Sequence, residues 1–81
     1  EPLVTYEITA LYHSKQFEKA DQIAGLLMDV YEKQLEEKQS DPMEESEIGQ
    51  IKQSLKMISD IAGENGHAAI KKRADELSLK F

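Results

Sequence analysis

Two histidines, His13 and His67, carry the side chains of this sequence that are best suited to chemistry near neutral pH. A neutral imidazole can transfer a proton or bind a metal ion. Both histidines fall in polar breaks between apolar patterns, so two hairpin turns at one end of the molecule would bring them near each other. No H-x-x-x-H or H-E-x-x-H spacing supports a metal site. We therefore interpret both as solvent-exposed turn residues, with a weak surface metal site as the alternative.

Other catalytic constellations are missing from the sequence. None of its serines lies in the glycine elbow that activates a nucleophilic serine. Gly63-x-x-Gly66 lacks the preceding strand and the lysine of a phosphate-binding loop, and it is typical of a helix end. Without any cysteine, disulfides, thiolate metal sites and thiol nucleophiles are excluded. The sequence therefore predicts no catalytic residue, no metal site and no cofactor, and we do not expect the chain to be an enzyme.

Charge and composition narrow the class of partner. Sixteen acidic and ten basic residues give a net charge of −6, which opposes binding to nucleic-acid phosphates and to anionic lipid. Three tyrosines, two phenylalanines and no tryptophan offer little surface for stacking nucleic-acid bases. No apolar run approaches the ~20 residues that span a bilayer, so this segment is not expected to insert directly into a membrane. A protein is the expected partner.

Two runs of charge have structural as well as functional interpretations. Within the acidic run Glu36–Glu47, Asp41 can cap a helix, Pro42 suits its first position, and Glu44 completes a capping box. Binding of a metal or of a basic partner is the alternative for that run. The basic run Lys71–Arg73 shares its helix with acidic residues, so we interpret it as a solvated face paired with them. Contact with an anionic partner is its alternative.

Apolar periodicity predicts an all-α chain of four helices, near residues 3–14, 17–38, 42–62 and 67–80. We expect one helical domain, 1–81, in which hairpin 3–38 and hairpin 42–80 stack and residues 36–47 form an acidic linker. One hairpin of this kind cannot bury its own apolar face and needs a neighbour. The predicted core consists of Ile8, Leu11, Phe17, Ala20, Ala24, Leu27, Leu55, Ile58, Ile61, Ala74 and Leu77.

A weak internal repeat supports the paired hairpins. When the chain is shifted by fifty residues, Ile8 meets Ile58 and Ala24 meets Ala74. The two polar breaks also coincide, residues 14–16 with residues 64–66. The expected architecture is therefore a small helical bundle or the start of an α-α superhelix.

The stretch KQFEKADQIAGLL, which begins at Lys15, resembles the second-helix half of a tetratricopeptide repeat. A turn, an aromatic residue, two polar residues and an alanine recur in that order in the family. The resemblance implies that Phe17 plugs the helix junction, and that Ala20 and Ala24 let the two backbones come close. Ile8 stands where the family prefers a small residue.

A second stretch, IKQSLKMISDIAGENGHAAIKKRADEL (Ile51–Leu77), resembles the C-terminal tail of certain bacterial multi-pass membrane proteins related to protein O-mannosyltransferases. Those proteins end in a soluble tetratricopeptide-like region. The resemblance implies a membrane-tethered, extracytoplasmic domain whose parent keeps its catalytic carboxylates elsewhere. Because the chain opens on Glu1-Pro2 rather than methionine, we also expect it to be a piece of a longer protein.

Two functions of different class follow from these observations. The first is a non-catalytic helical interaction or structural module that holds another protein or the upstream part of its own chain. Its expected partner surface is the apolar face of the first helix: Leu3, Val4, Tyr6 and Tyr12. The second is a small stand-alone acidic regulator that binds a basic protein, for which the run Glu36–Glu47 is the expected contact.

Overall fold

The computed structural model describes residues 2–37 and 43–81 of the chain, and within these ranges it contains helices and no strand. The helices are α1 (Pro2–His13), α2 (Phe17–Glu37), α3 (Glu45–Glu64) and α4 (Ala68–Lys80). The all-α class and the four predicted helices are thereby confirmed.

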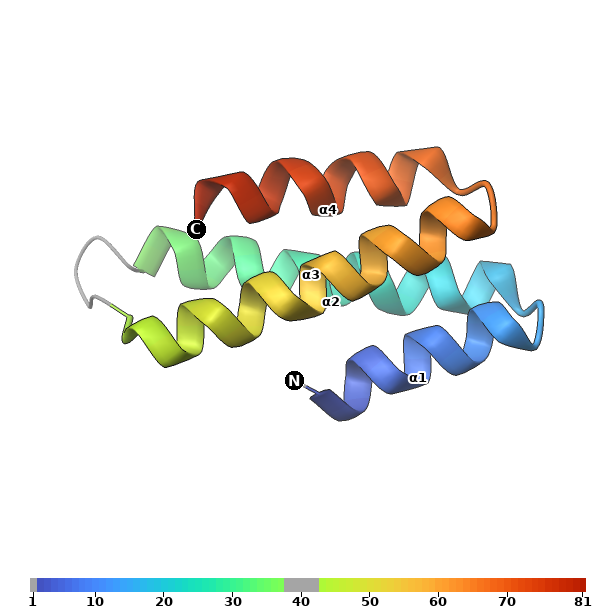
Figure 1. Cartoon of the computed structure of the whole chain (residues 1–81), viewed down its shortest axis with the longest axis horizontal. Helices are drawn as coiled ribbons and strands as arrows, with labels where there is room; N and C mark the ends of the chain where they lie inside the picture. The colour runs from blue at the N-terminus through green and yellow to red at the C-terminus, as the bar shows by residue number, and fades with distance from the viewer. Residues whose placement is uncertain (1, 38–42) are drawn as a thin grey trace.

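The helices form two antiparallel hairpins that lie on each other (Figure 1). In addition to the pairs α1–α2 and α3–α4, α1 packs along α3 and α2 packs along α4. Both hairpin turns lie at the same end of the molecule, to the right in Figure 1, and the end of α2 and the start of α3 lie at the opposite end. The stack measures 39 × 22 × 17 Å. The predicted pair of stacked hairpins is therefore confirmed as a small helical bundle.

One hydrophobic core runs between the two hairpins. Its buried apolar side chains are Ile8, Tyr12, Ala20, Ala24, Leu27, Met28, Tyr31, Ile51, Leu55, Ile58, Ile61, Ala62, Ala74 and Leu77. Nine of the eleven predicted core residues are in this set. The other two, Leu11 and Phe17, are half-buried and pack against the core from its edge. Four of the buried side chains are alanines, at positions 20, 24, 62 and 74, and such small side chains allow close approach of helices.

The two hairpin turns share one hydrogen-bond pattern. In the first, the Gln16 amide donates to the carbonyl of Leu11 at 2.8 Å, and in the second the His67 amide donates to the carbonyl of Ala62 at 2.8 Å. This six-to-one bond, together with a residue in the left-handed conformation just before it, defines the Schellman helix end. The equivalent residues are therefore 51 positions apart, and the shift of fifty predicted from the sequence repeat is wrong by one at the turns.

The left-handed residue differs between the two turns. It is Lys15, with φ of 63°, after α1, and Gly66, with φ of 76°, after α3. Only Gly66 has the freedom from Cβ crowding that this conformation favours. Gly63 belongs to the last turn of α3, and Asn65 caps that helix. The third helix therefore ends two residues later than predicted.

The start of α3 also differs from the prediction. The helix begins at Glu45, with Glu44 as its N-cap residue in an extended conformation and without a side-chain capping hydrogen bond. The predicted start was residue 42, and the proposed cap, Asp41, and Pro42 lie outside the described residues. Glu45 and Glu47 occupy the first turn, where their charges favour the positive end of the helix dipole.

Candidate functional site

The residues predicted to form a partner surface divide into two groups. Leu3 and Tyr6, on the outer face of α1, are 79% and 61% exposed, and Val4 is half-buried beside the core. Tyr12 is fully buried, so its predicted place on an exposed face is wrong. It lies one helical turn beyond Ile8, on the stripe of α1 that faces the second hairpin. That spacing was the signal in the sequence that pointed to burial.

A groove begins beside the first turns of α1. Because α1 has 12 residues whereas α2 has 21 and α3 has 20, α1 covers only part of the seam between the two long helices (Figure 1). The groove has a volume of about 520 Å³. Its lining consists of Thr5, Tyr6, Leu27, Val30, Tyr31, Gln34, Met43, Glu47, Gln50, Ile51, Gln53, Ser54 and Met57.

The lining of this groove is mainly apolar, with amides among the polar groups. Among the described residues that line it, Glu47 is the single charged one, whereas sixteen acidic and ten basic residues are spread over the whole chain. Val30 is 51% exposed within it, and Leu27 and Ile51 are buried residues that also line it. Apolar pockets with a few polar groups are the usual form of protein binding sites. The surface is therefore suited to apolar side chains of a partner.

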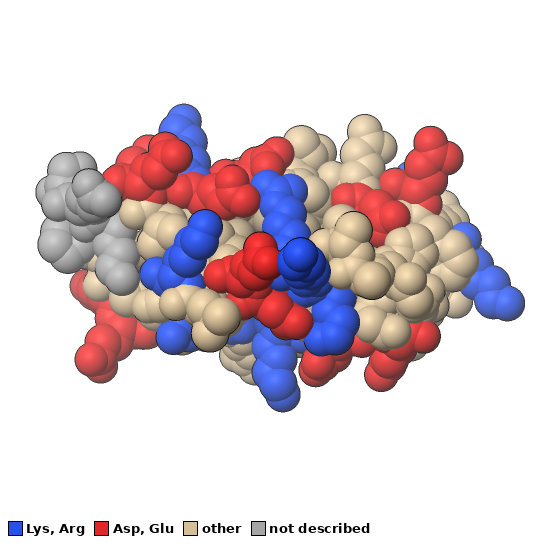
Figure 2. Space-filling view, turned by 90° about the horizontal axis from the view of Figure 1, so that it is seen from above, with Lys and Arg blue, Asp and Glu red and all other residues tan. Residues whose placement is uncertain are grey.

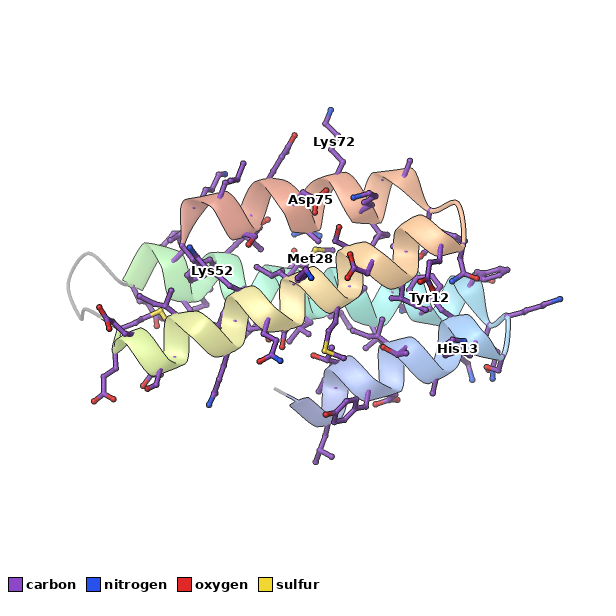
Figure 3. All side chains as sticks on the ribbon, in the orientation of Figure 1. Tyr12, His13, Met28, Lys52, Lys72 and Asp75 are labelled. Atoms are coloured by element: carbon purple, nitrogen blue, oxygen red, sulfur yellow. The ribbon has the colours of Figure 1, made fainter. Side chains whose placement is uncertain are left out.

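A polar cluster closes the opposite end, where the two turns meet. The Tyr12 hydroxyl donates a hydrogen bond to Asp21 Oδ1 at 2.5 Å, and Asp21 Oδ2 lies 2.9 Å from Nδ1 of His67. The ring of His67 stands edge-on to that of Tyr12, with 5.4 Å between centroids, and lies 4.9 Å from that of Phe17. Tyr12 thus points into the bundle at its turn end (Figure 3).

This cluster holds the hairpins together and is poorly suited to acid–base chemistry. Burial, followed by the hydrogen bond to Asp21 and its negative charge, raises the pKa of Tyr12 well above its ordinary value. A phenol that holds its proton so firmly is a poor proton donor, and its phenolate, the form that could act as a base, is not populated near neutral pH. His67 is half-buried, so its predicted exposure is wrong, whereas His13 is exposed as predicted. Among the described residues, no group of three histidine, aspartate or glutamate side chains could hold a metal ion.

The basic run of α4 is paired with acidic residues, as predicted from the sequence. Lys71 bonds to Asp75 at 3.0 Å, and the exposed Lys72 lies 4.0 Å from Glu76. Hydrogen bonds from Ser59 and from Lys71 lower the pKa of the Asp75 carboxyl. Figure 2 shows basic and acidic side chains side by side over this face, and Figure 3 shows Lys72 pointing away from the bundle.

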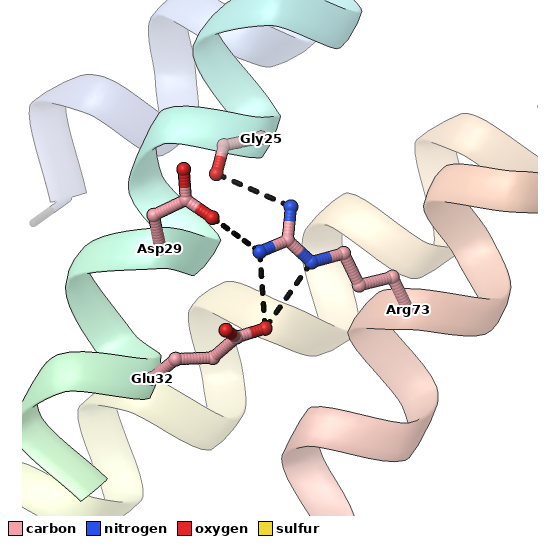
Figure 4. Close-up of polar contacts among 4 residues, drawn as sticks. All are labelled: Gly25, Asp29, Glu32 and Arg73. Carbon is pink, nitrogen blue, oxygen red and sulfur yellow. Dashed lines mark hydrogen bonds and ion pairs between the residues drawn. The ribbon is translucent and has the colours of Figure 1, made fainter. Parts of the chain in front are cut away.

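Arg73 turns the other way and joins the two hairpins. Its guanidinium binds the carboxylates of Asp29 and Glu32, and Nη1 donates to the carbonyl of Gly25 at 3.4 Å (Figure 4). Partly exposed ion pairs contribute about 0.2–1 kcal/mol each, and this one connects α4 with α2. One of the three basic residues is therefore committed to a contact within the bundle.

The described glutamates of the acidic run lie at the end opposite the turns. Glu36 and Glu37 close α2, and Glu44, Glu45 and Glu47 surround the start of α3; all five are exposed. Glu47 also lines the groove. The acidic end and the apolar groove are therefore neighbouring features of one surface.

No protein-family model, no curated protein and no solved structure matches this chain. The resemblances to tetratricopeptide repeats and to the tails of mannosyltransferase-related membrane proteins stay hypotheses. None of the described helices combines the length and the apolar character that crossing a membrane requires.

Proposed function

We propose that this chain is a non-catalytic helical interaction module, which holds another polypeptide through the first half of α1 and the groove beside it. The observation that carries the proposal is Tyr6, a strongly exposed side chain that lines a groove with one charged residue among its described lining residues; the exposed Leu3 precedes Tyr6 by one turn on α1. Exposed apolar residues that gather at a concave surface are typical of interaction sites, whereas scattered ones are not.

The energetics suit a modest or tethered interaction. Burying an exposed leucine side chain contributes roughly 1.5–3 kcal/mol, and a tyrosine contributes a similar amount. Association costs roughly 4–15 kcal/mol in lost freedom of motion, so these two anchors and the groove would give weak binding between separate molecules. A partner on the same polypeptide would bind much better, because tethering raises its effective concentration. The resemblance of Ile51–Leu77 to soluble tails of membrane proteins supports such a tethered module.

The acidic regulator is the second candidate function. It is favoured by the five exposed glutamates that gather at the ends of α2 and α3. In that case, a basic protein would contact the acidic end without using the apolar face of α1.

Nuclear magnetic resonance can test the proposed function on the isotope-labelled chain. The probes are designed helical peptides that share one leucine stripe and differ in charge. We expect shifts in the amides of Tyr6, Val30 and Ser54, and binding weakened about tenfold or more by the double variant Leu3→Ser/Tyr6→Ser. Leu79→Ser is the matched control, because Leu79 is 87% exposed on α4 and lies outside the groove. If none of the peptides shifts these amides, the chain is not an interaction module of this kind.

A further inference from the structure

The groove lies between α2 and α3, next to the place where α1 packs against them. α1 packs against both α2 and α3, and Thr5, Ile8 and Tyr12 form its buried stripe. Both long helices, α2 and α3, extend past the start of α1 (Figure 1), and residues of both line the groove. Since α1 has 12 residues and α2 has 21, the remaining length of the seam corresponds to roughly nine residues, or about 13 Å of helix. The occupant that fits this space is a helix of two to three turns.

The chemistry of the lining defines the inner face of that helix. Val30 offers exposed apolar surface, Leu27 and Ile51 are buried residues beside it, and the methionines Met43 and Met57 can adapt to the shape of an apolar partner. The remaining lining groups include three glutamines, at positions 34, 50 and 53. An apolar stripe with i, i+3, i+4 and i+7 spacing therefore matches the groove.

The charges around the groove define the outer end of the occupant. Glu47 is in the lining, Glu44 and Glu45 precede it at the start of α3, and the lining residues within 2–37 and 43–81 include no lysine or arginine. The whole chain carries a net charge of −6. A partner with a basic residue at this end is attracted, whereas an acidic one is repelled, and the effect is strongest at low ionic strength.

We propose that the groove binds a short amphipathic helix from another polypeptide segment, which places its apolar stripe against Val30 and a lysine or arginine near Glu47. The inference rests on the proposed function and specifies its partner. A second copy of this chain fits less well: the first half of its α1, residues 2–9, contains Glu7 and no basic residue. Two copies would also bring together two surfaces of the same negative charge.

The test uses three designed helical peptides of about 14 residues with the isotope-labelled full chain. The first has a leucine stripe with lysines at its polar positions, and the second has the same stripe with glutamates. The third has the lysines and a scrambled stripe. We expect the first peptide to bind about tenfold more tightly than the second in low salt, and the third to leave the groove amides unshifted.

Matched variants locate the binding site. Val30→Lys should weaken binding of the lysine peptide about tenfold or more, because it places a positive charge in the apolar groove. Leu79→Lys, on α4, should leave the affinity within about twofold of the parent. Glu47→Gln should weaken binding about threefold in low salt, whereas Glu64→Gln, an exposed glutamate at the other end of the same helix, should not.

The possible outcomes separate this inference from the proposed function. If the glutamate peptide shifts the groove amides and binds as tightly as the lysine peptide, the interaction module stands and the basic partner is wrong. If the scrambled lysine peptide binds as tightly as the striped lysine peptide, the contact depends on charge alone, as in the acidic regulator, and not on the groove. If analytical ultracentrifugation shows self-association that Val30→Lys abolishes, the occupant is a second copy. A lack of binding by every peptide, without self-association, overturns both.

Discussion

The first hairpin, α1–α2, and the second, α3–α4, end their leading helices with the same backbone geometry but with different residues. After α1 the left-handed position is held by Lys15, and after α3 it is held by Gly66. Each backbone bond around the first position has a counterpart 51 residues further on, and the second turn has one more, from the Asn65 amide to the carbonyl of Ala62. The same helix end can therefore be formed with or without a glycine. A residue with a Cβ, such as Lys15, costs roughly 1–2 kcal/mol in this left-handed conformation. The following predictions test how far the two hairpins are equivalent.

Core truncation should affect the second hairpin more than the first. Ile58 is completely buried, so Ile58→Ala should lower the free energy of unfolding by about 3–5 kcal/mol. Leu27 is 7% exposed and lines the groove, so the space left by Leu27→Ala joins solvent and should cost about 2–3 kcal/mol. Urea unfolding of both variants measures the difference. Equal losses of stability in the two variants would show that the space left by Leu27→Ala does not open to solvent through the groove.

Removing the hydrogen bond between Tyr12 and Asp21, near the two turns, should cause the next largest loss of stability. Tyr12→Phe removes the hydrogen bond to Asp21 and should cost about 1–2 kcal/mol at neutral pH. Because folding raises the pKa of Tyr12, the native state keeps a proton that the unfolded chain releases near pH 10. The stability from Tyr12 is therefore fully present below about pH 10 and is lost as the pH rises above it.

This alkaline loss can be measured by thermal unfolding from pH 8 to above pH 10. Tyr12→Phe should flatten the pH profile, and Tyr6→Phe, at an exposed tyrosine of the same helix, serves as the control. A profile of Tyr12→Phe that falls as steeply as the parent's would show that another group is responsible. Asp21 and His67 face Tyr12, so they are the first residues to replace in that case.

Substitutions at the two left-handed positions should change the stability of the chain in opposite directions. Gly66→Ala should destabilise the chain by about 1 kcal/mol, because it adds a Cβ where φ is 76°. Lys15→Gly should stabilise it by roughly 0.5 kcal/mol, since the relief of crowding is partly offset by greater freedom of the unfolded chain. Chemical denaturation of both variants tests the pair. Loss of stability in Lys15→Gly would mean that the lysine side chain supports its turn.

Glycines within the long helices should give stability changes of about the same size as those at the two turns. A Cβ added at Gly49, on α3, would have no described atom of another helix within 4 Å. Gly49→Ala should therefore stabilise the chain by about 0.5–1 kcal/mol. At Gly25, on α2, a Cβ would lie 3.8 Å from Nη1 of Arg73, which is an ordinary contact. Gly25→Ala should therefore gain a similar amount, and a destabilised variant would reveal that Arg73 needs this space. Thermal unfolding distinguishes the two outcomes.

Local pattern in the sequence was enough to predict the helices and most of the core. Positions such as Ala24, Ile58 and Leu77 repeat with helical spacing, and burial follows the apolar face of each helix. The same pattern does not define the buried polar pair Thr5–Ser54, whose hydroxyls meet at 3.1 Å between α1 and α3. Small polar residues enter a core only where a partner from another helix satisfies them, and that partner is 49 positions away in the chain.

Part of the candidate site was also predictable, and part was not. The sequence alone determined the unequal lengths of the first two helices and the apolar character of Leu3 and Tyr6, because both are properties of one segment. Tertiary structure decided that Tyr12 is buried against His67, that Arg73 joins α4 to α2, and that α1, α2 and α3 form a groove with Glu47 in its lining. Each of these features depends on how one hairpin is placed on the other. The helical spacing of apolar residues defines the buried face of each helix but does not specify how two such faces stack.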